Sequence, residues 1–543
     1  MKKKSILTSV LAGAMAISLL TGCGAGSQTT PTPTATPGGS TATPTPGGEA
    51  VSYPLNTDKK LTVWSSIMGP HKSYTDYTQS PYHTGLAEVT GVNVEWQFPT
   101  AGSDANQAFN LMLASDTLPD IIIHSFMNDA DRYIDEKVIR DLTDALPSKA
   151  PSYWALLQSD EHFDTSVKTD SGKYYGFGTF RSEPWNAAYT GPVVRQDWLT
   201  EQGLSVPETI ADWDNVLRVF NEKYDAKLAF ALSRMNPGIA GAFGAYGSFA
   251  IYNSILYVDD NGTIQCAMTQ PEWKNYMAQL NTWFKDGLVD PDVLTLDDAG
   301  MRTKALNNKV GLSFTSMGQM TNWLADASQN QTGAQWVGAN YPVVNKGDVV
   351  NTIQLEDIVR NYSASITTSC ADDKVDVALS WLDYLFTEEG ILYSNYGTEG
   401  DTYTLVDGVP TFTDKIMKAP EGISEAIDKY TAAQWTNIGV QQANMVRQKN
   451  NPTAVAAVDL WIQNQEASKH IVPTGVTRTT EESNEISAIL NTVGTYIQEM
   501  SLKFMVGEEP LSNFDAYVEN LKSIGLDRLL EIQQAAYDRY LAR

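Results

Sequence analysis

Cysteine and histidine are scarce in this chain. It has 3 cysteines and 5 histidines among 543 residues, and the histidines are too scattered to pair as metal ligands. Cys266 and Cys370, the two cysteines beyond the leader, lie far apart and lack metal-ligand spacing. We therefore predict neither a metal nor a cofactor. A disulfide between the two cysteines stays open, but we favour their burial as two small apolar side chains.

Positive charge is also in short supply. The chain has 38 Lys and Arg against 64 Asp and Glu, which gives a formal net charge of −26. Such a surface repels phosphate backbones, and no basic run stands out against it. Nucleic acid is therefore excluded as a partner.

Motifs that would indicate catalysis are missing as well. The chain contains no H-E-x-x-H and no G-x-S-x-G. Gly238, Gly241, Gly244 and Gly247 recur at every third position, which fits neither a dinucleotide-binding nor a Walker loop. Carboxylate pairs for glycoside hydrolysis arise by chance among so many acidic residues. We predict that the protein is not an enzyme, and keep a membrane-anchored glycan-degrading enzyme as the alternative.

One long apolar run is present, from Ile6 to Leu20. Three lysines precede it, and Leu20-Thr21-Gly22-Cys23 ends it. This pattern is typical of a secretory signal and is short for a membrane span. The last four residues resemble the lipobox of bacterial lipoproteins, whose cysteine receives a diacylglycerol after cleavage. The resemblance implies a signal peptide over 1–22 and a lipid anchor at Cys23. An uncleaved anchor helix or a plain secretory signal is the alternative.

A tether follows the cysteine, over residues 23–55. Thr-Pro and Pro-Gly-Gly repeats fill it, with no apolar periodicity for a core. At about 3 Å per residue, the stretch 24–52 reaches at most roughly 90 Å, enough to hold a domain clear of lipid. We therefore expect the folded part to work at the extracellular face of the membrane, held there only by its anchor.

The rest of the chain is long enough for two domains and alternates strand and helix patterns. Strands are predicted at 61–64, 92–96 and 121–123, with a helix at 108–113, which favours an α/β lobe with a mostly parallel sheet. Thr209 and Asp212 predict the capped start of a helix running to Asn221. Asn261-Gly262 predicts a hairpin turn. Apolar stripes predict packed helices at 486–500 and 514–521.

Several stretches, taken in order, resemble a known family. They are Phe109 to Asp120, Arg195 to Thr209, Ala378 to Gly390, Asn395 to Tyr403 and Gln533 to Tyr540. Together they resemble the extracellular solute-binding proteins, family 1, which feed carbohydrate importers of the ABC class in Gram-positive bacteria. The long branch that includes alginate-oligosaccharide binders is the most similar.

The resemblance implies an α/β, two-lobed periplasmic-binding-protein-like fold of type II, with hinge strands and a ligand cleft between the lobes. We place the first lobe at 56–180 and 362–410, and the second, with its helical C-terminal tail, at 181–361 and 411–543. The implied function is capture of a carbohydrate, expected to be an oligosaccharide, by hinge closure and its delivery to ABC permease subunits. A monomer is expected. A non-sugar solute such as a peptide is the alternative ligand. Some relatives carry a calcium loop, but Asn221 to Lys227 lacks its alternating oxygen ligands, so no calcium is predicted there.

Sugars present apolar ring faces and hydroxyl groups, which aromatic and polar side chains match respectively. Our candidate ligand contacts lie near the strand ends at the expected crossings: Trp64, Arg181, Glu183, Trp185, Trp336, Arg360, Tyr362, Tyr396 and Glu399. The alternative for each tryptophan is a place in the core, since large aromatic residues dominate cores. Arg195, Asp197 and Trp198 are read as lobe scaffold.

Overall fold

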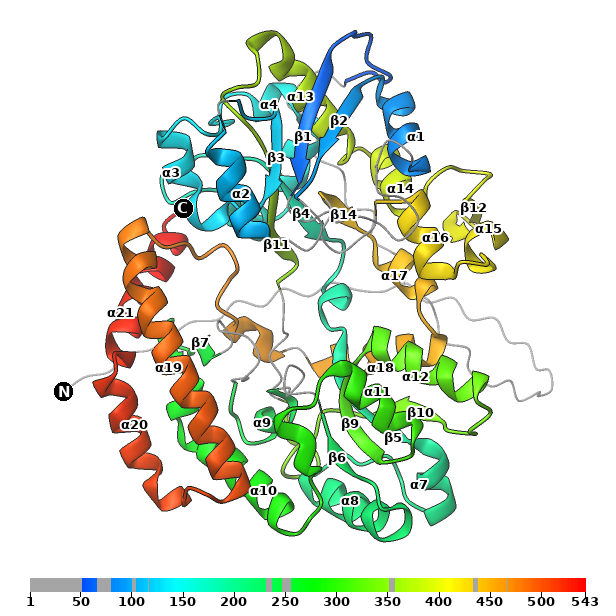
Figure 1. Cartoon of the computed structure of the whole chain (residues 1–543), viewed down its shortest axis with the longest axis vertical. Helices are drawn as coiled ribbons and strands as arrows, with labels where there is room; N and C mark the ends of the chain where they lie inside the picture. Colours follow the sequence, from blue (N-terminus) through cyan, green and yellow to red (C-terminus); the bar gives the residue numbers. More distant parts are fainter. Residues whose placement is uncertain are drawn as a thin grey trace, which may run out of the picture. The chain divides into compact units, whose positions relative to one another are not determined.

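The computed structural model describes residues 51–65, 80–99, 104–115, 117–230, 237–246, 255–350, 357–432, 438–464 and 466–543. The predicted signal peptide, the lipidation site Cys23 and most of the tether lie outside these residues. The described residues belong to one compact unit, in which two larger sheets are each covered by helices (Figure 1).

The first sheet has six strands in the order β14-β4-β11-β3-β1-β2. β11 is antiparallel to both of its neighbours, and the other pairings are parallel. The predicted strands at 61–64, 92–96 and 121–123 are confirmed as β1, β2 and β3. The strands of this sheet are β1 (Lys60–Ser65), β2 (Asn93–Gln97), β3 (Ile121–His124), β4 (Phe177–Arg181), β11 (Val359–Ile366) and β14 (Gly439–Gln441).

Both faces of this sheet are buried, which explains the uninterrupted apolar run in β3. Ile121 and Ile123 belong to the cluster under one set of helices, whereas Ile122 belongs to the cluster on the other side. Alternate residues of a strand point to opposite faces, so both faces need apolar side chains. The helices on the first side are α1 (Pro81–Thr90), α4 (Leu146–Lys149), α5 (Pro151–Gln158) and α13 (Asp372–Tyr384), and on the second α2 (Ala105–Leu113) and α3 (Ala130–Asp135).

The second sheet has four strands in the order β10-β5-β9-β6. Its core includes the inward face of α8 (Ile210–Tyr224), where Trp213, Val216 and Phe220 are buried. The predicted capping box is present, with Thr209 and Asp212 hydrogen-bonded to each other's backbone N–H. The strands are β5 (Thr190–Arg195), β6 (Lys227–Ala229), β9 (Val310–Ser316) and β10 (Trp336–Gly338).

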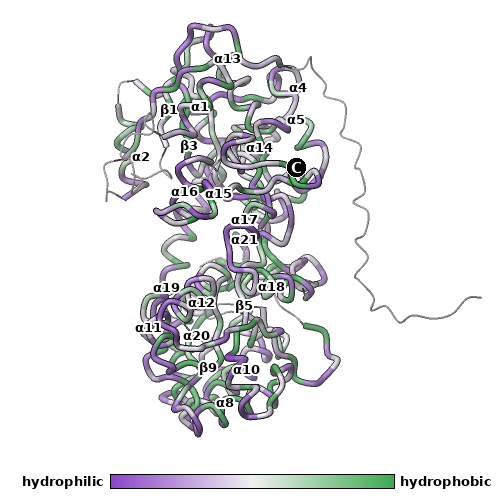
Figure 2. Tube along the Cα trace, turned by 90° about the vertical axis from the view of Figure 1, so that its right-hand side faces the viewer, coloured by the Kyte–Doolittle hydropathy of each residue, from purple (hydrophilic) through white to green (hydrophobic). Residues whose placement is uncertain are grey.

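Three C-terminal helices pack beside the second sheet's core, and two of them lie where the apolar stripes predicted helices, at 486–500 and 514–521. α19 (Thr480–Val506) contacts α10 (Pro271–Lys285), α20 (Phe514–Ser523) and α21 (Leu526–Leu541), and the three run side by side in Figure 1. Gly507 ends α19 with φ of 82°, a conformation that favours glycine. Hydrophilic and hydrophobic residues are interleaved in the region around α8 and α10 (Figure 2), as expected where helices have one buried face.

The remaining elements are short connections, hairpins and covering helices. The predicted turn at Asn261-Gly262 joins β7 to β8, with Gly262 at φ of 78°. The elements are α6 (Glu161–Ser166), α7 (Gln196–Gln202), α9 (Pro237–Ala242), α11 (Asp298–Leu306), α12 (Met317–Gln329), α14 (Glu388–Tyr396), α15 (Asp414–Met417), α16 (Ile423–Tyr430), α17 (Ala443–Lys449), α18 (Pro452–Trp461), η3 (Pro184–Ala187), β7 (Leu256–Val258), β8 (Ile264–Cys266), β12 (Tyr403–Val406) and β13 (Val409–Phe412).

The chain passes between the two large sheets more than once. It leaves the first sheet after β4, returns at β11, and leaves again after β14, because α18 contacts β5 and β10. We expected the last crossing from the first lobe to the second at 410/411. The chain instead crosses after β14, because β14 still pairs in parallel with β4 of the first sheet. The other lobe limits stay a prediction. Cys266 and Cys370 are free and buried, as we favoured.

Candidate functional site

The carboxyl ends of β1, β3 and β4 lie at one edge of the six-stranded sheet. Their last residues are Ser65, His124 and Arg181. β11 begins at this edge, where Arg360 is the register partner of Thr179 on β4. Ligands of α/β sheets bind outside the carboxyl ends of the strands, so this edge is the first place to look for a site.

Trp185 lies in the segment that leaves this edge. Its indole Nε1 donates a hydrogen bond of 2.8 Å to Oδ1 of Asp459 on α18. The guanidinium of Arg447 on α17 lies over the ring, with Cζ 4.1 Å from the ring centroid. Glu183 accepts from Arg447 at 3.5 Å. Two passages of the chain therefore meet around one indole ring.

Arg181 and Arg360 are near neighbours in this region. The Arg181 side chain is buried, with its Cζ 5.7 Å from the ring centroid of Tyr189, and its backbone N–H donates to the carbonyl of Ile358. Arg360 and Tyr362 are partly exposed and lie where the β11 register shifts against β4. The structure thus brings together Arg181, Glu183, Trp185 and the start of β11. Their contact with a ligand stays a prediction.

Several buried polar atoms near this edge have no hydrogen-bond partner within the described chain. They include Ser65 Oγ, Thr179 Oγ1 and Ser363 Oγ on the strands, and Asn186 Oδ1 in η3. Leaving such an atom unpaired costs about 1–3 kcal/mol. A solute with several hydroxyl groups could supply the missing partners.

Trp64, another predicted contact, is packed in the second-side core of the six-stranded sheet. It is only 5% exposed, and its ring centroid lies 5.9 Å from that of Phe109 and 6.4 Å from that of His124. Burial lowers the pKa of His124 to about 4, so its imidazole is neutral. The aromatic cluster around Trp64, at the carboxyl end of β1, is therefore uncharged.

Three further candidates lie apart from this region of the chain. Trp336, the first residue of β10, is 2% exposed in the core, and its ring centroid lies 5.0 Å from that of Trp323. Tyr396 is buried with Tyr403 in a separate cluster, where its hydroxyl accepts from Asn444. Glu399 is exposed in the turn before β12. Both aromatic rings are packed in apolar clusters away from the carboxyl ends of β1, β3 and β4, which favours a structural role for them.

Arg447, Asp459 and Asn186 were missed in the sequence. Asn186 Nδ2 donates to the carbonyl of Gln441 at 3.1 Å, so η3 and β14 are directly linked. β14 has only three residues, too few for a strand pattern to be recognised. The last crossing between the sheets was therefore expected before β14 instead of after it. Arg447 and Asp459, which follow β14, were for this reason not among the predicted contacts.

Arg195 and Asp197 form the scaffold that the sequence suggested. Arg195 is 2% exposed and donates to both carboxylate oxygens of Asp197, at 2.9 and 2.6 Å. Its Cζ lies 4.0 Å from the ring centroid of Trp198. The pair joins β5 to the start of α7.

Within the described ranges, no three His, Cys, Asp or Glu residues are grouped so that they could hold a metal ion. Asp225, at the end of α8, pairs instead with Lys309 at 2.7 Å. None of the helices described is both long and apolar enough to cross a bilayer.

A family model for the bacterial extracellular solute-binding proteins matches residues 72–391, which is more than half of the chain. This chain belongs to that family. The resemblance seen in the sequence is thereby confirmed, and the match of the fold to solved structures supports it independently.

Three relatives show the range of this solute-binding protein's similarities. The fructooligosaccharide ABC transporter substrate-binding protein FusA of Streptococcus pneumoniae is 21% identical over 521 residues, covering 91% of this chain and 93% of FusA. The lipoprotein LipO of Bacillus subtilis is 24% identical over 385 residues, covering 66% and 70%. The crystal structure of the alginate-binding protein AlgQ2 without calcium superposes with a TM-score of 0.69 at 21% identity, covering 90% and 100%. The predicted two-lobed type II fold is confirmed.

Proposed function

We propose that this solute-binding protein is the substrate-binding component of an ABC importer and captures an oligosaccharide. The solute lies at the carboxyl edge of the six-stranded sheet and against the segments that leave it. Hinge closure around the sugar gives the permease subunits a conformation to recognise. The protein works as a monomer at the extracellular face of a Gram-positive cell, held by acyl chains on Cys23.

The observation that carries this proposal is the group of unpaired buried polar atoms near the carboxyl edge of the six-stranded sheet. Ser65, Thr179, Ser363 and Asn186 offer hydroxyl and amide groups, and Trp185 and Arg181 add an aromatic ring and a cation. Together these side chains would recognise a solute that has both apolar ring faces and many hydroxyl groups. FusA, named for fructooligosaccharides, and AlgQ2, named for alginate, support a glycan as the solute class.

The proposed activity is binding without chemical change. The relatives are named as binding proteins. The two carboxylates around Trp185 already have partners: Glu183 pairs with Arg447, and Asp459 contacts both Arg447 and the indole N–H of Trp185. Such engaged carboxylates serve structure better than proton transfer.

Isothermal titration calorimetry on the purified mature chain tests the proposal. The panel holds neutral fructo- and manno-oligosaccharides, alginate oligosaccharides and short peptides. We expect saturable binding of one glycan class with a stoichiometry near one and no binding of peptides. Chromatography of the same mixtures after long incubation should return the glycan intact. Peptide binding alone, or shortened glycans, would contradict the proposal.

A further inference from the structure

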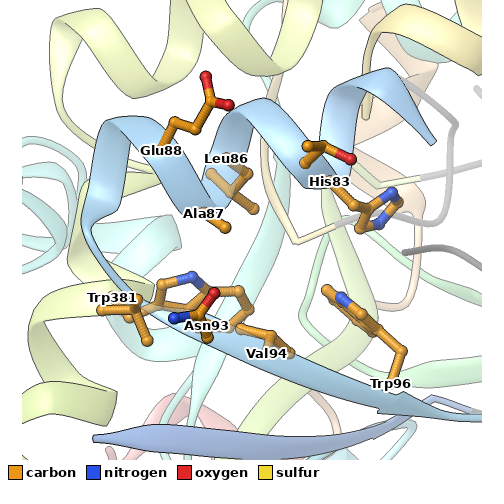
Figure 3. A pocket seen from close by; sticks show the side chains of 10 residues that line it. His83, Leu86, Ala87, Glu88, Asn93, Val94, Trp96 and Trp381 are labelled. Atoms are coloured by element: carbon orange, nitrogen blue, oxygen red, sulfur yellow. The ribbon is translucent and has the colours of Figure 1, made fainter. Parts of the chain in front are cut away.

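A cavity lies away from the carboxyl ends of the strands, between α1 and β2 (Figure 3). Its volume is about 360 Å³, within the range of about 300–1,000 Å³ typical of small-molecule sites. Asn93, which lines it, is the register partner of Lys60 at the beginning of β1. The cavity therefore begins at the amino end of β2, the edge strand of the six-stranded sheet. Trp185, in contrast, follows the carboxyl end of β4.

The walls combine aromatic, aliphatic and polar groups. Trp96 and Trp381 form one side, with ring centroids 6.1 Å apart at an interplanar angle of 61°. Leu86 on α1 and Val94 on β2 add apolar surface. Glu88 and Asn93 are exposed at the rim. This mixture suits a ligand that has both apolar ring faces and hydroxyl groups.

The buried indole of Trp381 carries an unused hydrogen-bond donor. Its side chain is 2% exposed, and Nε1 has no acceptor within the described chain. In Figure 3 this nitrogen faces the space between α1 and β2. An unpaired buried donor costs free energy that a ligand oxygen would recover.

Charge narrows the choice of ligand. Burial lowers the pKa of His83, which also lines the cavity, to about 3, so its imidazole is neutral at physiological pH. Glu88 is then the only charged group among the described lining residues. A carboxylate repels anions and accepts hydrogen bonds from hydroxyl groups.

We propose that this cavity is a second, independent site for a neutral mono- or disaccharide. A sugar oxygen accepts from Nε1 of Trp381, the ring packs against Trp96, and Glu88 and Asn93 bind hydroxyl groups at the rim. Such a site would hold a sugar on the first lobe without requiring hinge closure.

Ligand-observed NMR on the Trp185→Ala variant of the mature chain tests this proposal, because that background weakens the site proposed at the strand ends. The probes are glucose, galactose, fructose and sucrose. We expect at least one probe to give a saturable signal with a dissociation constant on the order of millimolar. Asn93→Ala should weaken that binding several-fold, and Ala87→Phe should abolish it by filling the cavity. Gln97→Ala, at an exposed position of the same strand outside the cavity, is the matched control and should change nothing.

Trp381→Phe tests the indole donor itself. It keeps an aromatic ring in the core, and a thermal melt of the variant distinguishes lost binding from lost folding. We expect weaker binding at an almost unchanged melting temperature. The proposal is overturned if no probe binds in the Trp185→Ala background, or if binding there is indifferent to both Asn93→Ala and Ala87→Phe. Loss of oligosaccharide binding at the strand ends would instead appear as a Trp185→Ala effect in calorimetry, so the two proposals fail separately.

Discussion

The guanidinium of Arg447 lies over the indole ring of Trp185, with 4.1 Å between Cζ and the ring centroid. Trp185 is in the first segment to leave the six-stranded sheet, and Arg447 follows the last strand to join it. A cation over an aromatic face contributes about 0.5–2 kcal/mol, more where water is excluded. The contact thus holds together two passages of the chain that must move in concert if the protein closes on a solute.

Replacing Trp185 by Ala should weaken oligosaccharide binding by roughly ten-fold or more, since it removes an aromatic surface and frees Arg447 and Asp459. Calorimetry with the glycan that the wild type binds measures the effect. Trp185→Phe is the control, because it keeps a ring for stacking but removes the Nε1 donor to Asp459, and should lose less affinity. Wild-type affinity in a folded Trp185→Ala variant would show that the solute lies elsewhere.

Cys23→Ala should release the protein from the membrane or leave it as an unprocessed precursor. In the proposed anchor this thiol accepts the acyl chains, and without two or more chains a soluble domain is held only marginally. Membrane fractionation and immunoblotting of cells check this. Cys370→Ala is the control, since Cys370 is free and buried in the folded part, and it should leave the protein in the membrane fraction. An unchanged distribution of Cys23→Ala would refute the anchor.

Features fixed by short-range chemistry were predictable from the sequence. The start of α8 was placed correctly because Thr209 and Asp212 satisfy each other's backbone groups whatever surrounds them. The hairpin at Gly262 was placed correctly because its positive φ is a local requirement. These elements depend on their own residues alone.

Features fixed by distant packing were not predictable. Trp185 and Trp336 look equivalent in the sequence, and both are buried, but Trp336 packs beside Trp323 whereas Trp185 contacts the charged side chains of Arg447 and Asp459. The three-residue β14 exists because β4 offers it a parallel partner, which no local pattern reveals. The lobe crossing and the charged partners of Trp185 could therefore be found only in the structure.

Removing the carboxylate of Asp197 should destabilise the protein by about 3 kcal/mol, because buried Arg195 would lose the partner of a buried ion pair. Burial raises the pKa of Asp197, but hydrogen bonds and the charge of Arg195 outweigh it and hold that pKa below its usual value. The pair's contribution is therefore present above pH of about 4 and is lost as pH falls through the lowered pKa. Urea unfolding of Asp197→Ala at pH 7 and pH 3 measures it, with Asp197→Asn as the milder control. Equal stability of Asp197→Ala and wild type at pH 7 would contradict the scaffold role.

Asp383 should behave in the opposite sense, because it is a carboxyl group fully buried on α13. Burial raises its pKa from 3.8 to about 6, so the folded state binds its proton more tightly than the unfolded state does. Asp383 therefore costs no stability below pH of about 4; its destabilising effect grows as pH rises toward about 6, above which the full cost is on the order of 3 kcal/mol.

Asp383→Asn should therefore stabilise the protein at pH 8, by about 1–3 kcal/mol, and leave it unchanged at pH 4. The amide keeps an oxygen that can accept from the backbone N–H of Tyr153, as Oδ1 does now at 2.8 Å, while the buried charge disappears. Urea unfolding at pH 4, 6 and 8 measures the difference. Asp376→Asn, on the exposed side of the same helix and paired with Lys149, should change stability by less than about 1 kcal/mol at every pH. A loss of stability for Asp383→Asn at pH 8 would mean that the ionised carboxylate is itself needed to join α13 to α5.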